Sequence, residues 1–215
     1  MATTTAATAT FPYVVDMDTF GRLVLRPPPD FSDDDFFDFC QRPENELLRI
    51  ERNAKGNIII MAPVGVEGGL TENEVAFELS AWAKRDGRGI AFGSNTGINL
   101  PDGSTLSPDA FWITKETWKA IPRAIREKFA PLVPPFVIEV RSPSDRKKEL
   151  HRKMLAYLRN GVELGWLIDP LSRTVAIYRQ GEPFIELENP SRVEGEGPVA
   201  GFVLDLKKIY DVLDA

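Results

Sequence analysis

A run of mostly apolar residues, FVIEVRSPSD, carries a glutamate and an arginine two places apart, Glu139 and Arg141. The apolar residues predict a buried strand from Phe136 to Val140, which the following Ser-Pro-Ser-Asp sequence interrupts. Side chains alternate across a strand, so Glu139 and Arg141 should share one face, roughly 6.5–7 Å apart. A buried carboxylate is unfavourable unless it is paired or bound to a cation. The pattern therefore fits either a structural ion pair or a cation-binding site.

A second carboxylate, Asp109, lies in SPDAFWI at the start of another short apolar strand. Ser-Pro-Asp is also common in turns, so this residue alone indicates little. Two carboxylates on adjacent strands would supply the oxygen ligands that Mg²⁺ prefers, and a nearby cation could orient a water or stabilise charge at a phosphate. Pro-Asp on one strand, followed by Glu-x-basic on the next central strand, resembles the pattern of the PD-(D/E)XK nucleases. The chemistry it favours is metal-dependent hydrolysis of a phosphodiester.

Composition excludes several other chemistries. The 215 residues include one cysteine, Cys40, and one histidine, His151, which rules out an internal disulfide and leaves too few ligands for the usual Cys/His zinc sites. His151 lies in the charged stretch RKKELHRK, an unfavourable place for the base of a Ser-His-Asp triad. No GxxxxGK[ST] loop is present. The net charge of −6 means that any contact with nucleic acid must be local.

The chain as a whole indicates one soluble domain. Residues 1–10, MATTTAATAT, form a low-complexity segment that we expect to be disordered, and residues 11–215 are expected to form a single domain. No apolar run approaches the roughly 18 residues that a membrane span needs, and no signal-peptide core is present. We therefore expect a cytoplasmic protein without a membrane partner.

The predicted elements alternate between helices and strands. Ser32 and Thr71 are the expected N-caps of two helices, Gly87 ends the second, and Pro122 breaks a third. The remaining elements are placed by hydrophobic periodicity. Strands are expected at 23–25, within 46–61 with a turn at 53–56, within 90–100, and at 110–113, 136–140, 164–169 and 174–179; a further helix is expected at about 146–159, and a strand and short helix at the C-terminus. This order predicts an α/β or α+β domain with one mixed central sheet flanked by helices.

Longer stretches resemble a known family. They are TGINLPDGSTLSPDAFWI, FAPLVPPFVIEVRSPSD, KMLAYLRNGVELGWLIDP and ENPSRVEGEGPVAGFVLDL. With their spacing they resemble the Uma-type restriction-endonuclease-like family of the PD-(D/E)XK superfamily, a bacterial group abundant in cyanobacteria. The resemblance runs from about Glu44 to the end of the chain, with a core at about 44–180. It implies a restriction-endonuclease-like fold, Asp109 and Glu139 as ligands of Mg²⁺ (or Mn²⁺), and DNA as the substrate.

The basic residue departs from the superfamily pattern, because Arg141 replaces the lysine of Glu-x-Lys. Arginine can bind phosphate but does not readily act as a base. The resemblance implies that the basic role has moved to the next helix, where Lys153 stands. Lys153 lies beside Leu150 and Tyr157 on the expected apolar stripe, which would direct it towards the sheet. The alternative is a surface pair with Glu149.

Two further acids are candidates. The resemblance implies a glutamate on the first core helix as a third catalytic and metal-binding residue, and Glu74 occupies that position. Thr71 and Glu74 also match a capping box, in which Glu74 would bond back to the backbone of Thr71. Glu51, on the strand within LLRIERN, is an additional acid that could reach the site.

Two functions follow from these residues. The first is a Mg²⁺-dependent endonuclease that hydrolyses DNA, with Asp109, Glu139, Lys153, Arg141 and Glu74 as the site. Such an enzyme would be a homodimer if it cuts both strands. The second is a catalytically inactive protein that keeps the fold and binds a nucleic acid or a protein; the missing Glu-x-Lys lysine and the acidic net charge favour it.

Overall fold

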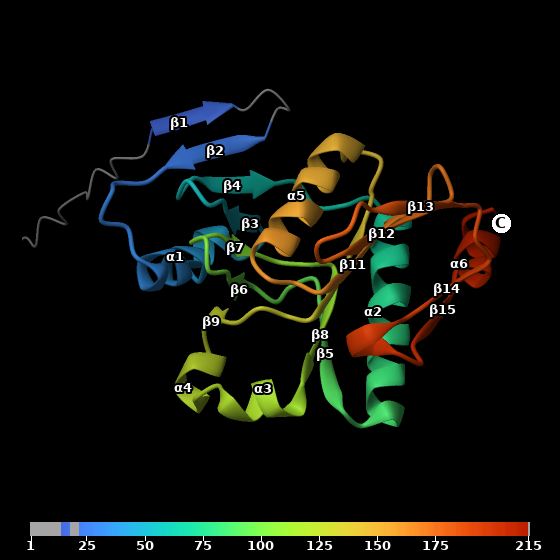
Figure 1. Cartoon of the computed structure of the whole chain (residues 1–215). Helices are drawn as coiled ribbons and strands as arrows, with labels where there is room; N and C mark the ends of the chain where they lie inside the picture. Colours follow the sequence, from blue (N-terminus) through green and yellow to red (C-terminus); the bar gives the residue numbers. More distant parts are fainter. Residues whose placement is uncertain (1–13, 18–21, 215) are drawn as a thin grey trace, which may run out of the picture.

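The computed structural model describes residues 14–17 and 22–214, so the expected disordered tail at 1–10 lies outside the described part (Figure 1). The helices are α1 (Asp33–Cys40), α2 (Val66–Asp86), α3 (Lys115–Ala120), α4 (Arg123–Arg126), α5 (Lys147–Arg159) and α6 (Leu206–Leu213), with 3₁₀ turns at Pro43–Asn45 and Gly197–Val199. The strands are β1 (Val14–Met17), β2 (Leu23–Arg26), β3 (Arg49–Arg52), β4 (Ile58–Met61), β5 (Gly89–Gly93), β6 (Ile98–Asn99), β7 (Thr105–Leu106), β8 (Ala110–Thr114), β9 (Ala130–Pro131), β10 (Phe136–Val140), β11 (Leu164–Asp169), β12 (Thr174–Arg179), β13 (Ile185–Glu188), β14 (Arg192–Glu194) and β15 (Val203–Asp205). No helix among the described residues is long and apolar enough to cross a membrane.

These strands form two mixed sheets and a small ribbon rather than the one central sheet that the sequence predicts. One sheet has the order β13-β12-β11-β10-β8-β5, and the other has the order β1-β2-β4-β3-β7-β6-β9. Strands β14 and β15 pair separately. In the first sheet β10 and β11 are parallel, because α5 connects them, whereas the other neighbours are antiparallel. The mixed α/β character is as expected, whereas the division of the strands into two sheets is not.

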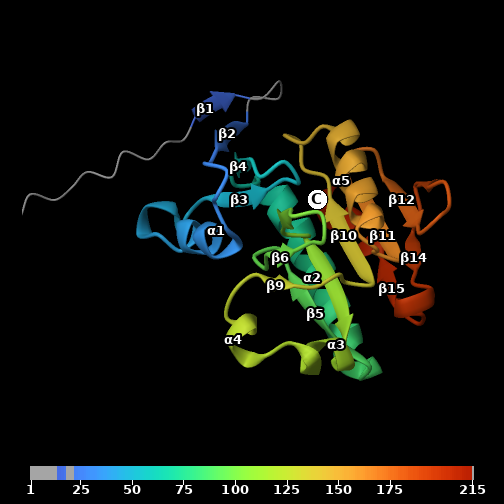
Figure 2. The same cartoon turned by 60° about the vertical axis from the view of Figure 1, so that its left-hand side comes forward.

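The faces of the six-stranded sheet follow the predicted alternation along β10. Phe136, Ile138 and Val140 belong to the apolar cluster that includes residues of α2 and α6. Val137 belongs to the cluster on the opposite face, which includes the buried face of α5. Figure 2 shows α2 and α5 on either side of this sheet. Glu139 has the same parity as Val137, so it faces α5.

A glycine on β11 lets α5 approach the sheet. A Cβ at Gly165 would collide with the end of the Met154 side chain and would also contact Val137. Met154 is fully buried and lies next to Lys153 on α5. The close contact therefore sets the height of this helix over β11, and with it the position of the lysine.

Most predicted elements form with small changes at their ends, but α2 begins earlier than predicted. Its N-cap is Gly65, which makes no side-chain capping bond, and Gly87 ends the helix in the left-handed conformation with φ of 78°. Thr71, the expected N-cap, is buried inside the helix and its hydroxyl donates to the Glu67 carbonyl over 3.0 Å. The predicted capping box of Thr71 and Glu74 is therefore wrong.

Candidate active site

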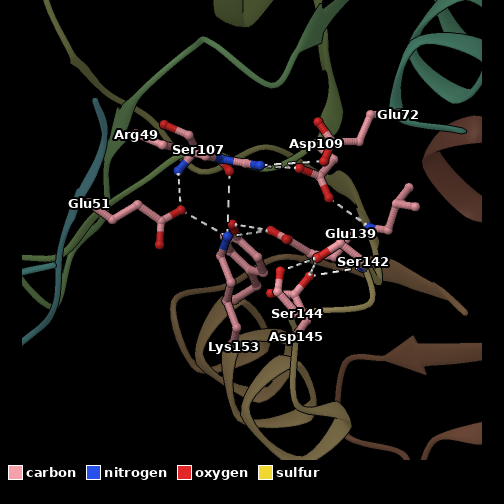
Figure 3. A network of polar contacts seen from close by, with 12 residues as sticks. Arg49, Glu51, Glu72, Ser107, Asp109, Glu139, Ser142, Ser144, Asp145 and Lys153 are labelled. Atoms are coloured by element: carbon pink, nitrogen blue, oxygen red, sulfur yellow. Dashed lines mark hydrogen bonds and ion pairs between the residues drawn. The ribbon is translucent and has the colours of Figure 1, made fainter. Parts of the chain in front are cut away.

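Adjacent strands place Asp109 and Glu139 side by side. Ala110 of β8 pairs with Ile138 of β10, so Asp109, which immediately precedes β8, lies next to the end of β10. There the Val140 amide donates to Asp109 Oδ2 over 2.7 Å. Asp109 and Glu139 are each only 2% exposed. The two acids predicted from the sequence therefore lie close together where two neighbouring inner strands of one sheet begin and end (Figure 3).

Lys153 reaches this pair from α5. Its Nζ lies 2.9 Å from Glu139 Oε1 and 2.8 Å from Glu51 Oε1. Glu51 Oε1 also accepts a bond of 3.0 Å from the Ser107 amide, and the Tyr157 hydroxyl donates to Glu139 Oε1 over 2.8 Å. The helical stripe thus points the lysine inwards, and the alternative pair with Glu149 does not form. Glu51, on β3, brings the second sheet into the same network.

A second cation, Arg49 of β3, occupies the other side of the site. Its Nη2 lies 2.6 Å from Asp109 Oδ1, and its Nη1 lies 3.4 Å from Glu72 Oε1 on α2. The Arg49 side chain is 25% exposed, whereas that of Asp109 is 3% exposed. Neither Arg49 nor Glu72 is predicted from the sequence, because their partners are far away along the chain and no local pattern connects them.

The network forms the floor of a pocket of about 850 Å³. One wall comes from α5 and the other from the β3–β4 hairpin. Basic residues line it beside the acids: Arg22, Arg49, Lys55, Arg146, Arg152, Lys153 and Arg159. Acidic residues line it in equal number: Glu51, Glu72, Asp102, Asp109, Glu139, Asp145 and Glu149. The formal charges of the lining therefore cancel, which makes the pocket less negative than the rest of this acidic chain, and its basic side chains are the groups that could contact a phosphate.

Two of the predicted site residues lie elsewhere. Arg141 follows the end of β10, and its Nη1 lies 3.0 Å from Asp169 Oδ2. It neither pairs with Glu139 nor lines the pocket. Glu74 does not line the pocket either, and Glu72, on a different face of α2, does. Two residues along a helix correspond to a rotation of about 200°, so Glu72 and Glu74 point to nearly opposite faces of α2, and only one of them can face the pocket.

Burial governs the ionisation of the site. It raises the pKa of Glu139 to about 8; Lys153 opposes this rise, whereas Asp109 and Glu51 add to it. Burial also raises the pKa of Asp109, against the opposing effect of Arg49 and Lys153. Burial alone would lower the pKa of Lys153, but Glu139 and Glu51 outweigh it and hold the pKa above its ordinary value. The raised pKa favours the ammonium form of Lys153, which suits charge stabilisation rather than proton abstraction.

The donor set suits a hard divalent cation in part. Among the residues that the structure describes, no group of three or more His, Cys, Asp or Glu side chains is arranged to hold a metal. Mg²⁺, however, is commonly held by one or two carboxylates together with water and substrate phosphate. Asp109 and Glu139 offer such a pair, and both bonds to Glu139 use the same oxygen, Oε1. Burial is the main cause of the raised pKa of Glu139, and repulsion from Asp109 adds to it; a bound cation would relieve this repulsion.

The raised pKa of Glu139 predicts a pH-dependent cost to stability. Between the ordinary value of 4.5 and about 8, the folded protein holds a proton on Glu139 that the unfolded chain releases. Stability should therefore fall as the pH rises through this window. In the Glu139→Gln variant the side chain at this position does not ionise. We expect its melting temperature in chelator to exceed that of the wild type by roughly 5 °C at pH 8, with little difference at pH 4.5.

Comparing two proteins that differ at one position cancels the contribution of the titrating groups that do not interact with Glu139. Melting curves from pH 4.5 to 8.5 measure the difference. Parallel curves for the two proteins would show that Glu139 ionises normally in the folded state.

Comparison with known proteins adds two findings. The model of the Uma2 family, described as "Putative restriction endonuclease", matches residues 33–207. The fold is similar to the crystal structure of "a putative nuclease belonging to DUF820" from Anabaena variabilis, with a TM-score of 0.66, 24% identity, and coverage of 81% of this chain and 96% of that one. No curated protein matches the chain.

Proposed function

The chain belongs to the Uma2 family, and from that premise we propose that it is a Mg²⁺-dependent endonuclease that hydrolyses phosphodiester bonds of DNA. The family description supports the reaction class. The pocket supports the chemistry, because it places two buried carboxylates and a lysine beside several basic residues.

Each residue of the floor has a role in this proposal. Asp109 and Glu139 would hold the metal, which when bound supplies a Lewis acid that polarises a water and the scissile phosphate. The Val140 amide fixes the Asp109 carboxylate, and the Tyr157 hydroxyl fixes that of Glu139. Lys153 would contact the phosphate and stabilise the negative charge that develops during hydrolysis.

The observation that carries the proposal is the meeting of Lys153 with Glu139 beside Asp109. The Nζ–Oε1 distance of 2.9 Å joins residues that lie on α5 and β10. The side chains of Lys153 and Glu139 are 17% and 3% exposed, so this is not a surface ion pair. Removing charges from water is costly, and clusters of such groups in a pocket are common at functional sites. A lysine and two acids in one pocket are the components that a metal-dependent nuclease uses.

Cleavage of supercoiled plasmid tests the proposal directly. The wild type should convert it to nicked or linear DNA in Mg²⁺ or Mn²⁺ and not in chelator, and Asp109→Asn should abolish the conversion. Plasmid that stays intact at millimolar metal, while gel shift shows that it is bound, would identify the inactive binding protein instead. An activity that survives in Asp109→Asn would belong to another site or to a contaminant.

Glu72 and Glu74 provide a matched pair that separates the two candidate third acids. Only Glu72 lines the pocket and contacts Arg49. We expect Glu72→Gln to lower the cleavage rate roughly tenfold, because it removes one charge near the metal, and Glu74→Gln to leave the rate unchanged within about twofold. Initial nicking rates of the two variants measure this. A lower rate for Glu74→Gln than for Glu72→Gln would instead place Glu74 in the site.

A further inference from the structure

Arg49 is the one cation on the pocket floor that the proposed function leaves without a role. Its guanidinium lies between Asp109 and Glu72, with N–O distances of 2.6 and 3.4 Å. Glu139 is also close enough to raise the pKa of Arg49. The arginine therefore sits in the field of three carboxylates, two of which are the proposed metal ligands.

Orienting Asp109 does not require Arg49. The Val140 amide already holds Asp109 through Oδ2, whereas Arg49 contacts Oδ1. The Arg49 side chain is also a quarter exposed to the pocket that it lines. It can leave the carboxylate by rotating its side chain towards the pocket, and Asp109 would keep its backbone anchor.

A divalent cation and Arg49 would compete for the same negative charge. Repulsion between them disfavours both staying in contact with Asp109, since like charges a few ångströms apart interact strongly in a buried site. A guanidinium displaced into the pocket would present a planar fork of donors, which matches two oxygens of a phosphate.

We propose that Arg49 is a built-in counter-ion of the metal site that becomes a ligand of the substrate phosphate. In the metal-free protein it balances Asp109 and Glu72; in the loaded protein it faces the scissile or an adjacent phosphate. This inference rests on the proposed function for its second half only, because the counter-ion role concerns metal binding without DNA.

Arg141 provides a matched control for Arg49. Each arginine pairs with a buried aspartate, and the side-chain exposures of the two pairs are alike, 25% and 3% for Arg49–Asp109 against 23% and 1% for Arg141–Asp169. Only the first pair lines the pocket. Arg49→Met and Arg141→Met thus remove comparable ion pairs, and only one of them belongs to the metal site.

Calorimetric titration of Mn²⁺ at pH 8, without DNA, tests the counter-ion role. We expect Arg49→Met to bind Mn²⁺ about tenfold more tightly than the wild type, and Arg141→Met to bind it equally well. Removing Arg49 also favours protonation of the acids, and protons compete with the metal. A divalent ion has twice the charge of a proton and gains twice the electrostatic energy, so tighter Mn²⁺ binding is still expected. Affinity that is unchanged or weaker in Arg49→Met would overturn this role. Arg49→Gln, which keeps a hydrogen bond without the charge, serves if the methionine variant does not fold.

Cleavage kinetics on an oligonucleotide at saturating Mn²⁺ test the phosphate role. We expect kcat of Arg49→Met to fall about 100-fold despite its tighter metal binding, whereas Arg141→Met stays near the wild-type rate. Unchanged kcat would overturn the phosphate role. If no protein cleaves DNA but Arg49→Met still binds Mn²⁺ more tightly, the nuclease proposal falls and the counter-ion stands; if the wild type binds no Mn²⁺, both fall.

Discussion

Glu139→Gln should lower the rate of Mg²⁺-dependent DNA cleavage by on the order of 10³-fold or more, while the protein becomes more stable at pH 8. Glutamine keeps the shape of the side chain and can still accept from the Tyr157 hydroxyl. It removes the charge that would hold the metal next to Asp109. Single-turnover cleavage of a labelled duplex measures the rate, and thermal melting in chelator measures the stability.

The opposite signs of these two effects are what make the prediction specific. A residue that only supports the fold would lose activity and stability together when it is replaced. Glu139 instead carries a cost to stability, because burial disfavours its ionised form. Groups placed for catalysis commonly have this property, since the site is arranged for a bound state and not for the free protein.

Glu188→Gln on β13 is a suitable control, because this residue is exposed and lies on the edge strand of the six-stranded sheet. It should leave the cleavage rate unchanged. A Glu139→Gln protein that cleaves DNA within tenfold of the wild type would remove Glu139 from the metal site, and with it the central part of the proposed mechanism.

Glu139 could be identified from the sequence because a carboxylate inside an apolar strand is a local anomaly, whereas Asp109, which precedes β8, was selected by the Pro-Asp and Glu-x-basic pattern. Glu139 stands in such a run, and period-two alternation then predicts the face that it shares with Val137. The position of Lys153 beside the apolar stripe of a helix is compatible with the site, but the family resemblance was needed to select it. For Glu139 the informative signal was a charge where the surrounding residues predict burial.

Arg49 and Glu72 could not be found in this way. Arg49 stands in the strand RIER, where charges alternate with other residues as they do on many solvated strands. Its partner Asp109 is 60 residues away, and only the approach of β3, in one sheet, to the start of β8, in the other, brings the side chains together. The division of the strands into two sheets is likewise a long-range property, since it depends on which short strands pair and not on their own composition.

Lys153→Met should lower the cleavage rate by about 10²–10³-fold, the range expected when a buried charge that stabilises a transition state is lost. The nearby acids, Glu139 and Glu51 foremost, outweigh the effect of burial and raise the pKa of Lys153, which favours its ammonium form. Its contribution is therefore positive charge at the phosphate. Lys153→Arg, which keeps the charge but changes the geometry, should recover part of the rate. Single-turnover rates of both variants at saturating Mg²⁺ measure these effects.

The comparison with Arg141→Met decides which basic residue replaces the lysine of the superfamily pattern. Arg141 contacts Asp169 outside the pocket, so its loss should leave the rate near that of the wild type. Lys153→Met also leaves Glu51 and Glu139 without their shared cation, so melting curves must show that the variant is folded before its rate is interpreted. If folded Lys153→Met cleaves as fast as the wild type while Arg141→Met does not, the basic role belongs to Arg141, and α5 serves only to cover the sheet.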